Sequence, residues 1–154
     1  MKFSTREDIE APIDHVFAQI SDFAGFERRA LRQGADVRRL GDGPAQVGTQ
    51  WDVSFKLRGR DRQMQVTLSA LEVPEMYQID ATSDGMNAET LVELVALSPR
   101  RTRLAVAIDL RPRSLTARVL LQSMKLAKTK LNKRFKARVL EYAEEIEDSY
   151  RKQG

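Results

Sequence analysis

The chain has 154 residues, of which 42% are hydrophobic, and its formal net charge is +4. A chain of this size and composition is typical of one globular domain, which we place at residues 1–154, and is neither disordered throughout nor fibrous. The sequence contains no cysteine and a single histidine, which excludes a disulfide scaffold, a cysteine nucleophile and a metal site of several cysteines or histidines. We therefore expect no metal and no other cofactor.

No segment approaches the roughly 18 consecutive apolar residues of a membrane-spanning helix. The first twelve residues alternate in polarity and carry charges, so they lack the apolar core of a signal peptide. Together these two features predict a cytoplasmic location.

The N-terminal part of the chain predicts a strand followed by two short helices. Residues 2–9 alternate between apolar and polar side chains, as a strand with one buried face does. Pro12 is suited to open a helix, because its missing N–H has no partner in a first helical turn. After an interruption, Phe23, Phe26 and Ala30 recur at helical spacing and predict a second short helix.

Six further segments alternate with the period of two that is typical of strands, and turn-forming residues separate them. A hairpin turn is expected at residues 58–61. Strands that are linked by hairpins pair antiparallel. The six segments are residues 35–40, 51–58, 63–70, 77–82, 90–97 and 104–110.

The last segment predicts one long helix. Ser114 is a plausible N-cap, and no glycine or proline follows until about Tyr150. Apolar residues recur there at steps of three, four or seven, over a length of roughly 50 Å. Only this helix is long enough to cover the apolar face of the sheet. The predicted fold class is therefore α+β, with a curved antiparallel sheet of about seven strands wrapped around a long C-terminal helix.

Four pieces of the sequence, in this order and spacing, carry a family resemblance. They are the first strand running into residues 9–17 and 20–23, the segment Val47–Trp51 that opens a strand, the hairpin at residues 55–60, and the terminal helix. The chain resembles the helix-grip fold of the START / birch-pollen-allergen superfamily, and more narrowly its SRPBCC branch of polyketide cyclase/dehydrase-like and lipid-transport proteins. The resemblance covers nearly the whole chain, but a fold alone does not select a function.

The resemblance implies a cavity between the sheet and the C-terminal helix. Its occupant would be an apolar or amphipathic small molecule such as a lipid, a quinone or a polyketide-like compound. A filled apolar core is the alternative, because periodicity does not measure a void. The residues expected to line the cavity are Trp51, Phe55, Met64, Val66, Leu68, Tyr77, Ile79, Val106, Ile108, Met124, Leu131 and Phe135.

We expect binding or transport rather than catalysis, because no known catalytic set of residues is present. An enzyme of the cyclase/dehydrase (aromatase-like) type is the alternative, and it needs a titratable group that faces the cavity. Glu7 and Glu93 are the candidates, since each falls in phase with apolar neighbours in a predicted strand. For Glu7 the alternative is an exposed strand edge, and Glu93 either points inward or marks a β-bulge.

The positive charge is concentrated in the last part of the chain. Residues 1–110 hold 14 basic and 17 acidic residues, whereas residues 111–154 hold 12 basic and five acidic ones. Such a surface suits an anionic membrane or a protein partner, and suits nucleic acid less because aromatic residues are not interleaved with the basic ones. The alternative is a solvated helix whose outer apolar residues contact a neighbouring element or a second copy in a homodimer. The basic residues expected opposite the apolar stripe of the helix are Arg118, Lys125, Lys133 and Lys136.

Overall fold

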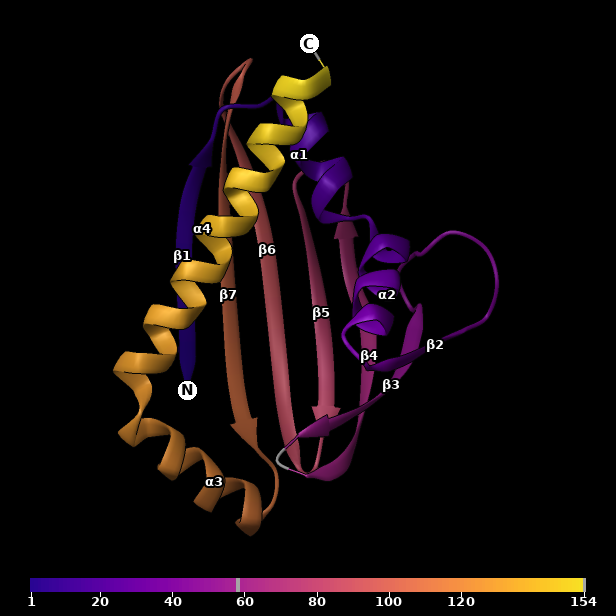
Figure 1. Ribbon diagram of the computed structural model, residues 1–154, viewed down its shortest axis with the longest axis vertical. Coiled ribbons are helices and arrows are strands. Elements are labelled where there is room, and N and C mark those ends of the chain that lie inside the picture. The colour runs from indigo at the N-terminus through magenta and orange to yellow at the C-terminus, as the bar shows by residue number, and fades with distance from the viewer. Residues whose placement is uncertain (58, 154) are drawn as a thin grey trace.

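The computed structural model describes residues 1–57 and 59–153. These residues form one sheet and four helices (Figure 1). In chain order the elements are β1 (Lys2–Ile9), α1 (Ile13–Ile20), α2 (Phe23–Arg32), β2 (Asp36–Leu40), β3 (Gln50–Leu57), β4 (Arg60–Glu72), β5 (Met76–Ser83), β6 (Met86–Ser98), β7 (Arg101–Pro112), α3 (Leu115–Leu126) and α4 (Lys128–Gln153).

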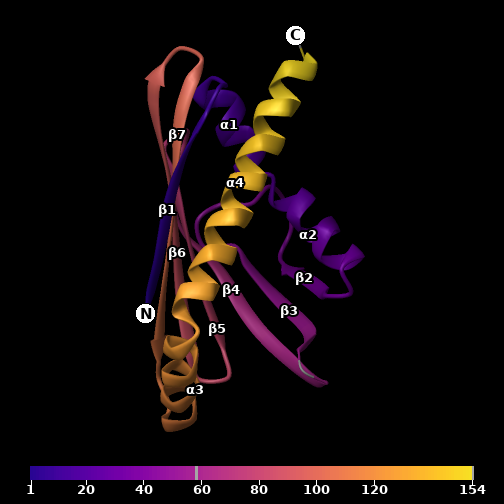
Figure 2. The same cartoon turned by 60° about the vertical axis from the view of Figure 1, so that its left-hand side comes forward.

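The seven strands form one antiparallel sheet in the order β1-β7-β6-β5-β4-β3-β2. Figures 1 and 2 show the sheet curved, with α1, α2 and α4 on the same side of it. The predicted α+β helix-grip architecture is confirmed, as are the strands and the two short helices after the first strand. The hairpin expected at residues 58–61 includes Arg58, which lies outside the described residues.

The buried core includes a group of side chains from α4, β1 and β7. Val139, Ala143 and Ile146 of α4 are buried there, and so are Ile9 of β1 and Leu104 of β7. The small side chain at position 143 lets the helix backbone approach the sheet closely. Buried groups at this density leave few voids, so this part of the interface is a packed core.

The C-terminal segment is not one helix, which corrects the expectation from periodicity. The predicted N-cap at Ser114 is present, since its hydroxyl accepts a hydrogen bond from the Ala117 N–H at 3.0 Å. The first helix, α3, ends at Ala127, whose dihedral angles (φ −102°, ψ 13°) are not helical. Figure 1 shows α3 and α4 running in different directions. Because the chain has neither glycine nor proline near the break, tertiary packing, with α3 on the end of β7 and α4 on β1, decides where the helix breaks.

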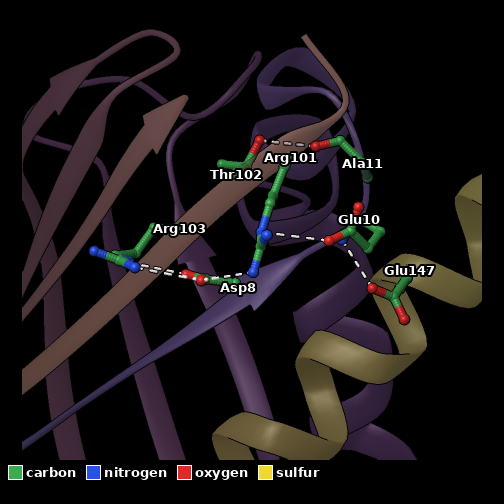
Figure 3. Close-up of polar contacts among 7 residues, drawn as sticks. All are labelled: Asp8, Glu10, Ala11, Arg101, Thr102, Arg103 and Glu147. Atoms are coloured by element: carbon green, nitrogen blue, oxygen red, sulfur yellow. Dashed lines mark hydrogen bonds and ion pairs between the residues drawn. The ribbon is translucent and has the colours of Figure 1, made fainter. Parts of the chain in front are cut away.

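A polar cluster fixes the junction between β1 and α1 (Figure 3). The guanidinium of Arg103 donates two hydrogen bonds to Asp8, at 2.8 and 3.3 Å. Arg101 lies between Asp8 and Glu10, at 3.2 and 3.3 Å from their carboxylates. The buried hydroxyl of Thr102 donates to the carbonyl of Ala11 at 2.8 Å. These contacts join the turn between β6 and β7 to the start of α1.

Replacing Asp8 by asparagine is expected to destabilise the protein at neutral pH and much less in acid. The hydrogen bond from Arg103 lowers the pKa of Asp8 below its ordinary value of 3.8. The stabilisation is therefore complete above pH 3.8 and is lost as the pH falls below it. Urea unfolding of D8N and wild type at about pH 7 and about pH 3 measures this difference. Asp14→Asn, at an exposed position, is the control, and a D8N deficit of equal size at both pH values would contradict the assignment.

Candidate functional site

An apolar pocket of about 240 Å³ lies between α2 and the concave face of the sheet. Helix α2 forms its roof, and strands β2 to β5 form its floor. This volume is below the roughly 300–1,000 Å³ of sites that enclose a whole drug-sized ligand. It suits a ring system or an alkyl segment. The lining residues are Phe23, Phe26, Glu27, Ala30, Val37, Trp51, Val53, Met64, Val66 and Ile79.

The sequence builds this pocket from two periodicities. In α2, Phe23, Phe26 and Ala30 are three and four residues apart, so they share the face that looks onto the sheet. In the strands, alternate residues such as Val53 and Val66 point to the same side. Phe23 and Trp51 are buried, but the other floor residues are only half-buried. The roof is therefore held at one end and leaves apolar surface of the sheet uncovered.

An aromatic cluster holds α2 at that end. The ring of Phe23 lies 5.7 Å from Trp51 and 5.2 Å from Tyr77, centroid to centroid. The Tyr77 hydroxyl donates to the carbonyl of Ile20 at 2.7 Å, and burial raises the pKa of this phenol. The Tyr142 hydroxyl of α4 donates to the carbonyl of Gln19 at 3.1 Å, and burial raises its pKa to about 12. Both phenols are thus neutral donors that anchor the end of α1, and neither is available as a base.

Glu27 is the one charged residue among the pocket's lining residues. Its Oε1 atom accepts hydrogen bonds from the indole N–H of Trp51 at 2.5 Å and from Nε of Arg39 at 2.9 Å. The Arg39 guanidinium also lies 5.6 Å from the centre of the Trp51 ring and donates to the carbonyl of Gly43 at 2.8 Å. The second carboxylate oxygen, Oε2, makes no hydrogen bond within the described residues. A ligand hydroxyl or amine at the pocket would find its acceptor there.

Sequence reasoning missed Glu27 and Arg39 as site residues. The available signal was the position of Glu27, one residue after Phe26 on a short amphipathic helix. Arg39 lies on the inner face of an edge strand, opposite Trp51 in the register of β2 and β3. A charged residue pointing inward from an edge strand needs a partner, but the sequence does not say that the partner comes from α2.

The expected cavity residues do not all line one pocket. Trp51, Met64, Val66 and Ile79 line the pocket under α2. Leu68 and Tyr77 belong to the packed core. The remaining six are half-buried: Phe55, Val106, Ile108, Met124, Leu131 and Phe135.

The expected position of the cavity is corrected by this distribution. The apolar pocket lies under α2 and not under the C-terminal helix. The reason is that α4 packs on β1, and Phe135 itself packs edge-on against Phe3, with ring centroids 6.1 Å apart.

The two candidate catalytic carboxylates lie away from this pocket. Glu7 is half-buried on the inner face of β1, opposite Leu104, and α4 covers this part of the sheet. Glu93 is exposed and points outward, because its neighbours Val92 and Leu94 are the buried ones. No register shift occurs at Glu93, so both readings that the sequence offered for it are wrong. The error arises because both faces of β6 carry apolar residues, which leaves the phase of the strand ambiguous.

Glu93 instead lines a larger hollow of about 520 Å³ on the opposite side of the sheet. Its walls are mainly outward-facing residues of β1, β6 and β7, such as Ser4, Arg6 and Ala105. These polar and small side chains offer little apolar surface to a ligand. The pocket under α2 is therefore the better candidate, although it is smaller.

The four expected basic residues are all exposed, but they do not share one helix face. Arg118 and Lys125 belong to α3, whereas Lys133 and Lys136 belong to α4. Lys136 lies beside β1, at the rim of the hollow that Glu93 lines.

No group of three or more potential metal ligands occurs within residues 1–57 and 59–153, and no helix among them meets the length and hydropathy of a membrane span.

Several solved proteins share this architecture along nearly the whole chain. The protein TTHA0849 from Thermus thermophilus is 12% identical with a TM-score of 0.64, and the match covers 97% of this chain and 98% of that one. Zhui aromatase/cyclase from Streptomyces sp. R1128 is 16% identical with a TM-score of 0.67, covering 96% and 93%. Ara h 8.0201 is 13% identical with a TM-score of 0.59, covering 92% and 98%.

At these identities the similarity establishes the fold and not the activity. No protein-family model and no curated protein sequence matches the chain. The structural matches nevertheless extend over more than nine-tenths of each chain. The chain therefore has the helix-grip fold that these solved proteins share.

Proposed function

We propose that the protein binds an apolar or amphipathic small molecule, with its apolar part in the pocket under α2. The observation that carries this proposal is the composition of the pocket, in which apolar side chains surround a single carboxylate that is held in place by Trp51 and Arg39. An uncovered apolar surface with few fixed polar groups is typical of small-molecule sites. The free Oε2 of Glu27 favours ligands that also carry a hydrogen-bond donor.

A cyclase or dehydrase activity is the second candidate, and one observation favours it. The similar structures include the aromatase/cyclase Zhui, and Glu27 is a carboxylate at the pocket wall. Glu7 and Glu93 are not in reach of this pocket, so Glu27 replaces them as the candidate acid or base. Two donors already engage its Oε1, which makes a positioning role better supported than proton transfer.

Trp51 makes binding directly measurable. It is the only tryptophan in the chain and forms part of the pocket wall. The apolar dye N-phenyl-1-naphthylamine is expected to change the Trp51 emission as it fills the pocket, and to become more fluorescent itself. The dye is a small aromatic amine, so it has both the apolar body and the N–H donor that the site would accept.

A larger side chain in the pocket is expected to weaken binding of the dye. Val66→Phe places a ring in the space of about 240 Å³ and should weaken dye binding about tenfold or more, since tenfold corresponds to only about 1.4 kcal/mol. Val95→Phe makes the same change on the exposed outer face of β6 and should bind the dye as the wild type does. Equal affinities of V66F and V95F, with both variants folded, would refute the assignment of the pocket.

A further inference from the structure

Helix α3 carries an apolar face that nothing in the described chain covers. Leu115, Val119 and Leu126 are 78%, 59% and 93% exposed. Successive residues of a helix turn by about 100°, so these three side chains lie within about 40° of one another. The buried residues of α3 are Ala117 and Leu121, which lie roughly opposite. Apolar residues therefore occupy two sides of α3, the side that packs on the protein and the side that faces away from it.

The chain segment that forms and follows this face is basic. Residues 111–138 contain ten lysines and arginines and no aspartate or glutamate. Arg118 and Lys125 flank the exposed stripe on one side of the helix, and both are exposed. Long basic side chains can lay their apolar stems along such a stripe while their charged ends reach outward.

Charge is distributed unevenly along α3 and α4. Figures 1 and 2 show α3 at the end of the molecule away from the C-terminus. The second half of α4, toward the C-terminus, carries five acidic and no basic residues between positions 139 and 150. An anionic surface would therefore attract α3 more strongly than the acidic stretch of α4, which favours an orientation with the exposed stripe toward that surface.

A second copy of the chain fits this face poorly. In a symmetric dimer through α3, the same basic side chains of both copies would meet, and the segment offers no acidic residue to pair with them. Three side chains on one short helix are also a small patch compared with the about 800 Å² per partner of a stable interface. Nucleic acid would engage the charges but would leave the leucines exposed.

We propose that α3 docks on the surface of an anionic phospholipid membrane, with Leu115, Val119 and Leu126 inserted among the acyl chains and the neighbouring basic residues on the headgroups. Apolar insertion and electrostatic attraction together give the reversible binding of interfacial helices. This surface is separate from the pocket under α2, so the two sites are testable independently.

Co-sedimentation with vesicles tests the docking. The wild type is expected to bind vesicles that contain phosphatidylglycerol, to bind pure phosphatidylcholine weakly, and to lose binding as salt is added. The triple variant L115S/V119S/L126S should lose about tenfold or more of its binding, because it removes the apolar surface that would insert among the acyl chains. The matched control L57S/V95S/L97S removes three other exposed apolar side chains and should bind as the wild type does.

Two charge reversals measure the electrostatic contribution to vesicle binding separately from the apolar one. R118E/K125E should weaken binding about tenfold or more, because it replaces two basic residues beside the stripe with acidic ones that anionic headgroups repel. R100E/K152E changes two exposed residues elsewhere and should not. V66F, with its pocket filled, should still bind vesicles.

Three results would overturn the proposal. The first is absence of binding to the phosphatidylglycerol vesicles. The second is binding that R118E/K125E weakens but L115S/V119S/L126S leaves unchanged, because that behaviour indicates a polyanion site without insertion. The third is a concentration-dependent dimer in sedimentation velocity that the serine variant dissociates. Circular dichroism of each variant shows that the exposed substitutions leave the fold intact.

Discussion

Leu104→Ala is expected to lower the free energy of unfolding by about 2–5 kcal/mol. Leu104 is 1% exposed, lies on the inner face of β7 and faces the region where α4 packs on the sheet. Its truncation removes buried apolar surface and leaves a cavity that the close-packed α4 interface cannot refill by a small movement. A typical domain has only about 5–15 kcal/mol of stability, so the loss is large. Urea unfolding followed by circular dichroism measures it.

Leu97→Ala is the matched control for this prediction. Leu97 lies in β6, the strand that pairs with β7, but its side chain is 41% exposed and points outward. Its truncation is expected to change the free energy of unfolding by about 0.5 kcal/mol or less. If L104A and L97A lost equal stability, the packed core between α4 and the sheet would be misplaced.

Glu27→Ala is expected to lower the free energy of unfolding by about 1–3 kcal/mol, because it leaves two donors without their acceptor. The indole N–H of Trp51 and Nε of Arg39 both donate to the same oxygen of Glu27. The side chains of Glu27 and Arg39 are 26% and 21% exposed, so water compensates the loss in part. The Trp51 emission maximum should shift as its hydrogen bond is lost, and unfolding followed at this single tryptophan gives both readings.

Glu27→Gln separates the hydrogen bond from the charge. The amide oxygen can still accept from the indole, so E27Q should keep most of the stability and most of the Trp51 spectrum. It removes the ion pair with Arg39, whose contribution at a partly exposed position is about 1 kcal/mol or less. A loss in E27Q as large as that in E27A would show that the charge, and not the accepted hydrogen bond, holds α2 on the sheet.

The sheet was predictable because most of its strands bury one face. In β3 the alternation of Trp51 and Val53 with Asp52 and Ser54 has only one phase that buries the apolar set. The phase of β6 was not predictable in this way. Leu91, Val95 and Leu97 form an apolar series on the outer face, so the alternation of this strand fits either orientation.

The break between α3 and α4 and the position of the pocket depend on contacts between distant residues. The sequence around Ala127 has no glycine or proline, and its periodicity continues through the break. The pocket lies under α2 because Phe23 anchors one end of that helix, while the contacts of α4 with β1 close the other side of the concave face. No local pattern encodes either result. Glu27 lies at the pocket because the fold places α2 opposite Trp51, which donates a hydrogen bond to it.

Methyl NMR during a titration with N-phenyl-1-naphthylamine tests the central claim, the apolar site under α2, most directly. We expect saturable chemical-shift changes at the methyl groups of Val53, Val66 and Ile79, which line the pocket. The methyl groups of Ile9 and Ile146, in the packed core beneath α4, should not move. Shifts confined to the exposed leucines of α3, or no saturable shift at the three pocket residues, would contradict the claim.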